Sequence, residues 1–244
     1  MPVEAADPPS TQALTYIVRD QRRMALAKNY YAWQAALVRR EIGARVIDAG
    51  CGIGNFTKRL LDRELVIAVD HDPEAIRRLA SRRHGANLRT VTGDIAAPEF
   101  RELARFGADS CVCLNVLEHI EDHHAALSNM AAVVQRGGTV VLLVPAFPAL
   151  YGPIDRNLGH YRRYRSAQIR ELALAAGLRV RSVHYFNSAG FFAWWFNARV
   201  LRRQEHSPAQ IRFYDGWIVP ALSRVESVVR PPFGQSLFAV LEKP

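Results

Sequence analysis

Three aspartates stand at the ends of apolar stretches that have the length of buried strands. Asp48 precedes a loop with glycine at 50, 52 and 54, Asp70 ends the second stretch, and Asp94 follows the third. Open α/β sheets bind ligands at the edge where parallel strands end, so three carboxylates there predict one ligand site. Asp70, twenty residues after Gly50, can accept both hydroxyls of a ribose.

The glycine loop allows the backbone to approach a ligand closely, and a helix that begins after it offers free N–H groups. Its spacing is not the G-x-G-x-x-G pattern of dinucleotide sites. A carboxylate beneath the loop, here Asp48, suits a cationic ligand group better than a pyrophosphate. A plain strand-to-helix turn is the alternative interpretation of the glycines at 50, 52 and 54.

Two histidines are candidate bases, since histidine titrates closest to neutral pH. His119 follows Glu118 at the end of the fourth apolar stretch, and we expect it to act as a base or to orient a loop. His160 lies in the segment 155–165, which also holds four arginines and two tyrosines. Packing alone is the alternative for His119.

The segment 155–165 follows the fifth apolar stretch, so it can fold over the same sheet edge. Arginine forks match phosphate and carboxylate geometry, and the segment is therefore expected to bind an acceptor molecule, with His160 or Tyr161 near the nucleophile. A solvated basic loop paired with Asp155 is the alternative. The expected acceptor-binding residues of this loop are Arg156, Arg162, Arg163 and Tyr164.

Apolar runs alternate with helical stretches along most of the chain, which predicts βαβ units and a parallel sheet covered on both faces. The expected strands are 45–49, 65–70, 88–92, 110–114, 139–144, 180–186 and 236–242, and the expected helices are 11–42, 55–61, 73–83, 98–106, 122–135 and 166–177. We divide the chain into an N-terminal tail and helical lid (1–43), a ligand-binding domain (44–186 plus 236–244) and an aromatic, basic cap (187–235).

The charge distribution points to an anionic partner for the last third of the chain. The net charge is +9 in 244 residues, and residues 151–244 hold 14 basic against 6 acidic residues. Phosphate, a membrane surface and nucleic acid are the candidate partners, and a GC-rich genome is the neutral explanation. Three cysteines and an N-terminus without a signal-peptide pattern favour a cytoplasmic location.

Residues 45–145 resemble the class I S-adenosylmethionine-dependent methyltransferases. VIDAGCGIGNFT, VIAVDHDP, GDI, CLNVLEHIED and RGGTVVLLVP are similar to that superfamily's motifs, in order. The resemblance implies a Rossmann-like sheet of seven strands with the last antiparallel, and S-adenosylmethionine as cofactor. It implies that Asp48 and the 50–54 backbone hold the methionine end, Asp70 the ribose and Asp94 the adenine amine. It also implies that Ile95 and Asn115 line the cofactor.

A narrower resemblance is to a bacterial methyltransferase subgroup with an NYxxW helix (29–33), an LYGxxDRxxGHYRRY loop (150–164) and a PPFGQSLFAV tail (231–240). Related quinone-pathway O-methyltransferases carry a metal-binding ExxEH where this chain has Asn115 in place of the first Glu. We therefore expect no metal. Tyr30, Trp33 and Glu118 become relevant if the nucleophile is an alkene carbon.

The sequence thus predicts an S-adenosylmethionine-dependent methyltransferase of a small acceptor with an anionic group, phosphate or diphosphate, and an apolar isoprenoid or lipid body. The aromatic stretch 182–198 is interpreted as a cap over the site, or alternatively as a helix lying on the inner membrane face. A non-catalytic cofactor sensor and a nucleic-acid methyltransferase are the competing functions, and no nucleic-acid partner is expected. O-, N- and C-methylation and the oligomeric state stay open.

Overall fold

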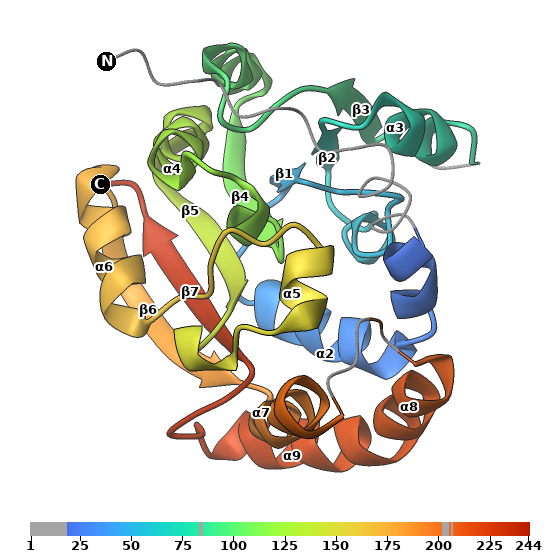
Figure 1. Cartoon of the computed structure of the whole chain (residues 1–244). Helices are drawn as coiled ribbons and strands as arrows, with labels where there is room; N and C mark the ends of the chain where they lie inside the picture. The colour runs from blue at the N-terminus through green and yellow to red at the C-terminus, as the bar shows by residue number, and fades with distance from the viewer. Residues whose placement is uncertain (1–18, 83–84, 202–204, 206) are drawn as a thin grey trace, which may run out of the picture.

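A twisted sheet of seven strands forms the centre of the computed structural model, which describes residues 19–82, 85–201, 205 and 207–244 (Figure 1). The strand order is β3-β2-β1-β4-β5-β7-β6. The bounds are β1 Arg45–Ala49, β2 Leu65–Asp70, β3 Leu88–Thr92, β4 Ala108–Leu114, β5 Val134–Pro145, β6 Arg179–Phe186 and β7 Ser236–Glu242. Strands β1 to β5 pair in parallel, and β7 runs antiparallel to both neighbours. The predicted sheet, including its antiparallel last strand, is confirmed.

Apolar residues cover both faces of this sheet, as the continuous apolar runs predicted. Ile47 packs with Cys111 and Val140 on one face. On the other face, the adjacent residues Val46, Val112 and Val141 pack with Trp33, because successive side chains of a strand point to opposite faces. Burial on both faces fixes the positions of the strand ends from which the site is built.

Helices flank the sheet and close one edge of it (Figure 1). The bounds are α2 Lys28–Val38, α3 Pro73–Ala80, α4 His123–Val133, α5 Pro153–Asn157, α6 Ser166–Ala175, α7 Ser188–Trp195, α8 Pro208–Phe213 and α9 Val219–Val228, with shorter helical turns Thr57–Arg59, Pro98–Phe106, Leu117–His119 and Pro148–Leu150 and wider turns Phe196–Val200 and Tyr214–Ile218. None of the helices within the described residues is long and apolar enough to cross a membrane.

The N-terminal helix differs from the prediction of one helix over 11–42. Its start, like the predicted tail 1–10, lies outside the described residues, and the helical path is interrupted at residues 25–27 before α2 begins. The reason is tertiary. The carboxylate of Asp215, from the cap, accepts hydrogen bonds from the backbone N–H of Asn29 (3.1 Å) and Tyr30 (2.8 Å). These first-turn N–H groups have no partner inside a helix, so Asp215 supplies the N-terminal cap of α2.

Two further boundaries were predicted wrongly. Residues 55–61 form only the short turn Thr57–Arg59 instead of a full helix. Strand β5 begins at Val134 rather than at 139, because Val134 pairs with Ala108 across a local irregularity in the ladder. Both differences arise from pairing and packing with distant residues, which local patterns do not contain.

Candidate active site

A cavity of about 740 Å³ lies between the glycine loop, helix α2, the loop 155–165 and the cap. The glycine loop and the ends of β1 and β4 contribute its polar side, with Asp48, Asn115 and Glu118. The cap and α2 contribute aromatic walls. The lining aromatic residues are Tyr30, Tyr31, Phe56, Trp194, Phe196, Phe213 and Tyr214. The cavity therefore combines acidic groups at the strand ends with aromatic walls, and polar residues of the cap such as Asn187 and Asp215 also line it.

The glycine loop forms a cradle of backbone atoms. Gly50, Gly52 and Gly54 all have positive φ angles (80°, 51° and 81°), a region that favours glycine. A Cβ at Gly50 would lie 2.4 Å from the Val116 side chain, so the loop excludes side chains there. The Gly52 N–H donates to Asp70 Oδ2 (2.7 Å), which links the loop to the end of β2. Such a cradle fits a ligand that the backbone must approach closely.

Asp48 is buried beneath this loop and lines the cavity. Its Oδ2 accepts a hydrogen bond from the Thr57 hydroxyl (2.7 Å). Burial raises the pKa of Asp48 to about 6, against the lowering effect of the Thr57 hydrogen bond. A cationic ligand group would offset the cost of burying the charged form, so this carboxylate fits the ammonium and sulfonium charges of S-adenosylmethionine.

The other predicted cofactor residues lie beside the cradle in differing environments. Asp70 is buried at the end of β2, and its second oxygen accepts from the Asp72 N–H (3.0 Å). Asp94 is exposed and accepts from the Ala96 N–H (2.8 Å), and Ile95 is buried in the core. Asn115 has a positive φ of 54° and lines the cavity. In the described residues, the cavity lining includes Asp48 and Asn115 but not Asp70, Asp94 or Ile95.

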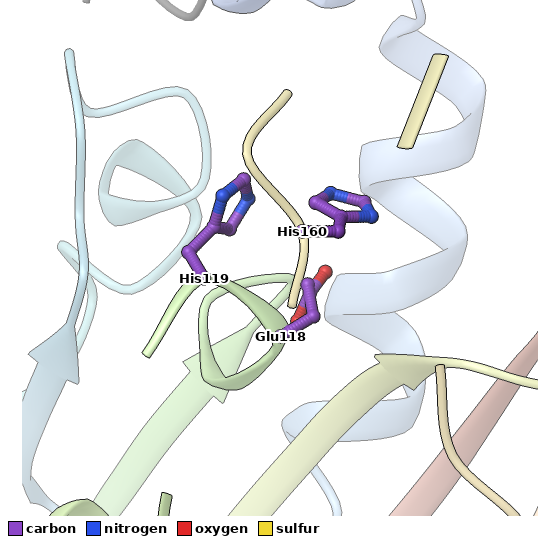
Figure 2. Close-up of side chains that lie close together, drawn as sticks. All are labelled: Glu118, His119 and His160. Carbon is purple, nitrogen blue, oxygen red and sulfur yellow. The ribbon is translucent and has the colours of Figure 1, made fainter. Parts of the chain in front are cut away.

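Glu118, His119 and His160 meet at the polar end of the cavity (Figure 2). One nitrogen of each histidine and one Glu118 oxygen all lie within 4.8 Å of one another. The two imidazole rings are perpendicular (87°), with centroids 4.5 Å apart. Glu118 and His119 are adjacent in a short turn after β4, whereas His160 comes from the loop after α5. The fold thus unites residues that are more than forty positions apart in the chain.

Burial changes the proton affinity of this cluster. It raises the pKa of Glu118 to about 7, and the interactions with His160 and Arg163 oppose this rise. Desolvation and the neighbouring His160 lower the pKa of His119 to about 3, although the Leu158 carbonyl hydrogen-bonds to its ring. His119 is therefore neutral at physiological pH, and Glu118 is poised to gain or lose a proton.

Asp155 organises the loop side of the cluster, and the sequence did not single it out as a site residue. Its Oδ1 accepts hydrogen bonds from His160 Nδ1 (2.8 Å) and Arg163 Nε (2.9 Å), and its Oδ2 accepts from the Gly152 N–H (2.8 Å). Burial alone would raise the pKa of Asp155, but His160 and Arg163 hold it below its usual value. A bond at Nδ1 fixes the ring and directs the other nitrogen, Nε2, away from the carboxylate. An aspartate five residues before His160 was the available signal.

The arginines of the loop do not converge on one anion. Arg163 is buried, bonded to Asp155, and stacked on the Trp194 ring (4.4 Å from the centroid). Arg162 donates to the Glu121 carbonyl (2.9 Å) and lies over the ring of Tyr161, and Arg156 is exposed. Among the predicted loop residues that the structure describes, only His160 and Arg163 line the cavity.

The aromatic residues predicted to contact substrate divide between the cavity and the core. Tyr30 lines the cavity, and burial raises its pKa to about 12. Trp33 is buried against Phe186, with ring centroids 4.2 Å apart. Tyr164 is fully buried and donates to the Leu117 carbonyl (3.1 Å), while Tyr161 is about half exposed. Trp33 and Tyr164 thus have structural partners, and Tyr161 faces solvent.

Cap residues that sequence reasoning missed complete the cavity. The hydroxyl of Tyr214 donates to Asn187 Oδ1, and Asn187 also bonds Gln235 (2.8 Å). Asp215 ties the cap to α2, as described above, and Asn187, Tyr214, Asp215 and Gln235 all line the cavity. Asn187, Tyr214 and Asp215 lie in segments without a recognisable motif, and the PPFGQSLFAV tail that contains Gln235 carried no assigned site residue.

Comparison with known proteins agrees with this geometry. A family of methyltransferase domains matches residues 19–183, which is more than half of the chain. An uncharacterized methyltransferase of Mycobacterium tuberculosis is 38% identical over 106 residues, covering 43% of this chain and 52% of that protein. The chain therefore spans about half the length of these mycobacterial relatives. A ubiquinone biosynthesis O-methyltransferase of Xanthomonas oryzae is 28% identical over 181 residues, covering 67% and 73%.

Solved structures share the fold at low sequence identity. A chain from the complex between the Haloferax volcanii Trm112 methyltransferase activator and a methyltransferase superposes with a TM-score of 0.67 at 18% identity, covering 98% of this chain and 100% of that one. The magnesium protoporphyrin IX methyltransferase of Synechocystis, solved with bound S-adenosylhomocysteine, has a TM-score of 0.53 at 16% identity, covering 98% and 90%. Since the backbone cradle and buried Asp48 fit S-adenosylmethionine as cofactor and the family match spans most of the sheet, this chain belongs to the class I S-adenosylmethionine-dependent methyltransferases.

Proposed function

We propose that the protein methylates a hydroxyl oxygen of a small, partly apolar acceptor. The single observation that carries this proposal is the Glu118–His119–His160 cluster in a cavity to which the cap and α2 contribute aromatic walls. A cluster of titratable groups beside aromatic walls favours an acceptor with one polar, reacting end and an apolar body. The distant similarity to a protein named as a ubiquinone biosynthesis O-methyltransferase supports the same class of acceptor.

The chemistry requires alignment and removal of one proton. The cofactor supplies an electrophilic methyl group on a sulfonium. A bond forms between the acceptor oxygen and the methyl carbon, the carbon–sulfur bond breaks with its electron pair going to sulfur, and the hydroxyl proton leaves to the cluster. Residues of this chain position the oxygen and exclude water, which supplies much of the rate gain in such a displacement. His160, oriented by Asp155 (2.8 Å), presents its free nitrogen to that proton.

We do not propose that the arginines of the loop 155–165 bind a phosphate group of the acceptor. Arg163 is neutralised by Asp155, and Arg156 and Arg162 do not line the cavity in the described structure. An isoprenoid-like or lipid-like body suits the walls formed by Trp194, Phe196 and Phe213. The basic excess of residues 151–244 therefore needs another explanation.

That explanation is a proposed contact of the cap with an anionic membrane surface. Three apolar residues that are 60–75% exposed recur at helical spacing from the end of α8 through the turn Tyr214–Ile218 into α9, namely Phe213, Trp217 and Val225. The exposed Arg212 and Arg224 are adjacent in sequence to this stripe. Apolar and aromatic residues next to arginines are typical of helices that lie in a membrane interface. Further exposed apolar residues of the cap are Phe192, Trp195, Phe196, Val200, Leu201, Val228 and Val229. Phe196 and Phe213 also line the cavity, so an apolar acceptor could enter from that surface.

A transfer assay tests the proposed reaction. The protein is incubated with methyl-labelled S-adenosylmethionine and a panel of phenols and catechols with and without prenyl tails, beside RNA, DNA and total lipid extract. We expect labelled methyl ethers from the tailed hydroxyl compounds or the lipid extract, and about 100-fold less product with His160→Gln. The matched control is His124→Ala, because His124 is exposed on α4 outside the cavity lining. Label found only in nucleic acid, or on carbon or nitrogen, would refute the proposal.

A further inference from the structure

The cluster of Glu118, His119 and His160 has the composition of a metal site as well as that of a proton relay. Two imidazoles and one carboxylate are the ligands that hold many catalytic zinc and non-haem iron ions. Their candidate ligand atoms lie within 4.8 Å of one another. Two ligands bonded at about 2.1 Å to one ion lie at most about 4.2 Å apart. A small side-chain rotation therefore brings all three atoms into coordinating range.

One buried oxygen atom of the cluster lacks a hydrogen-bond partner among the described residues. Glu118 is 1% exposed, and its Oε2 has no hydrogen-bond partner among the described residues. A buried carboxylate oxygen without a partner is costly, and native structures leave few such groups unexplained. A cation at the point where the histidines approach would satisfy this oxygen and offset its burial.

Both histidines are held in the way that metal ligands are usually held. His160 Nδ1 bonds to Asp155 (2.8 Å), which leaves Nε2 as the free nitrogen. The Leu158 carbonyl engages the ring of His119. A carboxylate or carbonyl on the second ring nitrogen fixes the tautomer and strengthens the first nitrogen as a ligand. Asp155 is itself fixed by Arg163 and by the Gly152 N–H, so the support extends into a rigid loop.

The site is also open on one side. Glu118, His119 and His160 all line the cavity that contains the glycine cradle, so an ion on these three ligands would keep coordination positions facing the acceptor. Figure 2 shows the three side chains converging on one space from two separate segments. Three protein ligands with free positions are the pattern of catalytic rather than structural sites.

We propose that Glu118, His119 and His160 bind one divalent transition-metal ion, of the zinc or iron class, which holds the acceptor oxygen beside the cofactor. Mg²⁺ is disfavoured because it prefers oxygen ligands and near-octahedral geometry. The ion would lower the pKa of a bound hydroxyl. With the ion bound, the free nitrogen of His160 is a ligand, so the hydroxyl proton leaves to solvent rather than to His160 before the oxygen accepts the methyl group. This role deepens the proposed function and rests on it, whereas the binding of the ion does not. The proposal replaces the expectation from the sequence that no metal binds.

Metal titration of the tag-free protein tests the site directly. The protein is stripped with a chelator, dialysed, and titrated calorimetrically with ZnCl₂, MnCl₂ and MgCl₂, and Co²⁺ is added separately to record its visible absorption. We expect one Zn²⁺ per chain, weak or no Mg²⁺ binding, and a Co²⁺ spectrum typical of nitrogen and oxygen ligands. Glu118→Gln, which keeps the shape of the side chain, and His160→Ala should each weaken Zn²⁺ binding by about 100-fold or more.

Two further variants separate a built site from general histidine binding. Asp155→Asn should weaken Zn²⁺ binding by about 10-fold to 100-fold, as expected for a residue that only orients a ligand. His124→Ala removes an exposed histidine and should bind Zn²⁺ like the wild type. Circular dichroism confirms that each variant is folded. Zn²⁺ binding that is equal in wild type, Glu118→Gln and His160→Ala, or absent from folded wild type, would overturn the metal proposal.

The same measurements distinguish this inference from the proposed reaction. Methyl transfer to a hydroxyl that persists in the stripped protein with chelator present would overturn the metal proposal and leave the O-methyltransferase in place. Zn²⁺ binding that depends on Glu118 and His160 supports the site even where the transferred methyl group is found elsewhere than on oxygen, because calorimetry needs neither cofactor nor acceptor.

Discussion

The buried pair of Asp155 and Arg163 offers the sharpest test of how the loop 155–165 works. Both side chains are essentially inaccessible, at 0% and 1% exposure. Arg163 Nε donates to Asp155 Oδ1 at 2.9 Å, and a second guanidinium nitrogen, Nη1, donates to the Ala146 carbonyl at 3.2 Å. Removing one charge of such a pair leaves the other buried and uncompensated. We therefore expect Asp155→Asn to lower the free energy of unfolding by about 3–5 kcal/mol.

Replacing Arg163 should lower the free energy of unfolding less than replacing Asp155. In Arg163→Met the Asp155 carboxylate keeps its hydrogen bonds from His160 and the Gly152 N–H, so the expected loss is about 1–3 kcal/mol. The double variant should be more stable than Asp155→Asn alone, because it removes the unpaired guanidinium. The two residues should therefore show a coupling of at least about 1 kcal/mol.

Urea unfolding followed by tryptophan fluorescence, with chelator present to keep metal out of the comparison, measures all four proteins. Equal slopes against urea would confirm that the same structure unfolds in each. A cost below about 1 kcal/mol for Asp155→Asn, or strictly additive effects, would refute the buried-pair reasoning. Arg163 would then be available for the anion that the sequence analysis assigned to it.

Three other predictions concern the cofactor and the cap. Burial raises the pKa of Asp48 to about 6, so the affinity for S-adenosylhomocysteine, whose amino group is cationic, should fall about tenfold per pH unit below pH 6. Calorimetry on Asp48→Asn should show weak binding without that pH dependence. The same pH dependence in the variant would contradict the assignment. Asp70→Ala should weaken binding of the same ligand by about tenfold or more, since the ribose hydroxyls lose a carboxylate acceptor. Unchanged affinity would remove Asp70 from the site. The Phe213→Ser, Trp217→Ser double variant should bind phosphatidylglycerol vesicles at least about tenfold more weakly than the wild type in a sedimentation assay. Leu174→Ser on α6 is the control for loss of an exposed apolar residue (71% exposed). Equal sedimentation of the wild type and both variants would refute the membrane contact.

The sheet could be predicted from the pattern of apolar runs, and the cofactor from the resemblance of residues 45–145 to a known superfamily. Short continuous apolar runs such as 65–70 favour buried strands, and their alternation with helices leaves few topologies other than a parallel sheet. The glycines at 50, 52 and 54 and the buried Asp48 could be predicted because their roles depend on backbone conformation and on neighbours within a few residues.

Tertiary structure decided the reacting end of the site. His160 reaches Glu118 only because the loop after α5 folds over the end of β4, where the Tyr161 N–H donates to the Glu118 carbonyl (2.8 Å). Sequence spacing could not reveal that Arg163 is neutralised by Asp155, nor that Asp215 caps α2 from a segment 185 residues away. Contacts between segments far apart in the chain form when buried polar groups find partners as the core packs, and no local pattern records which partners those are.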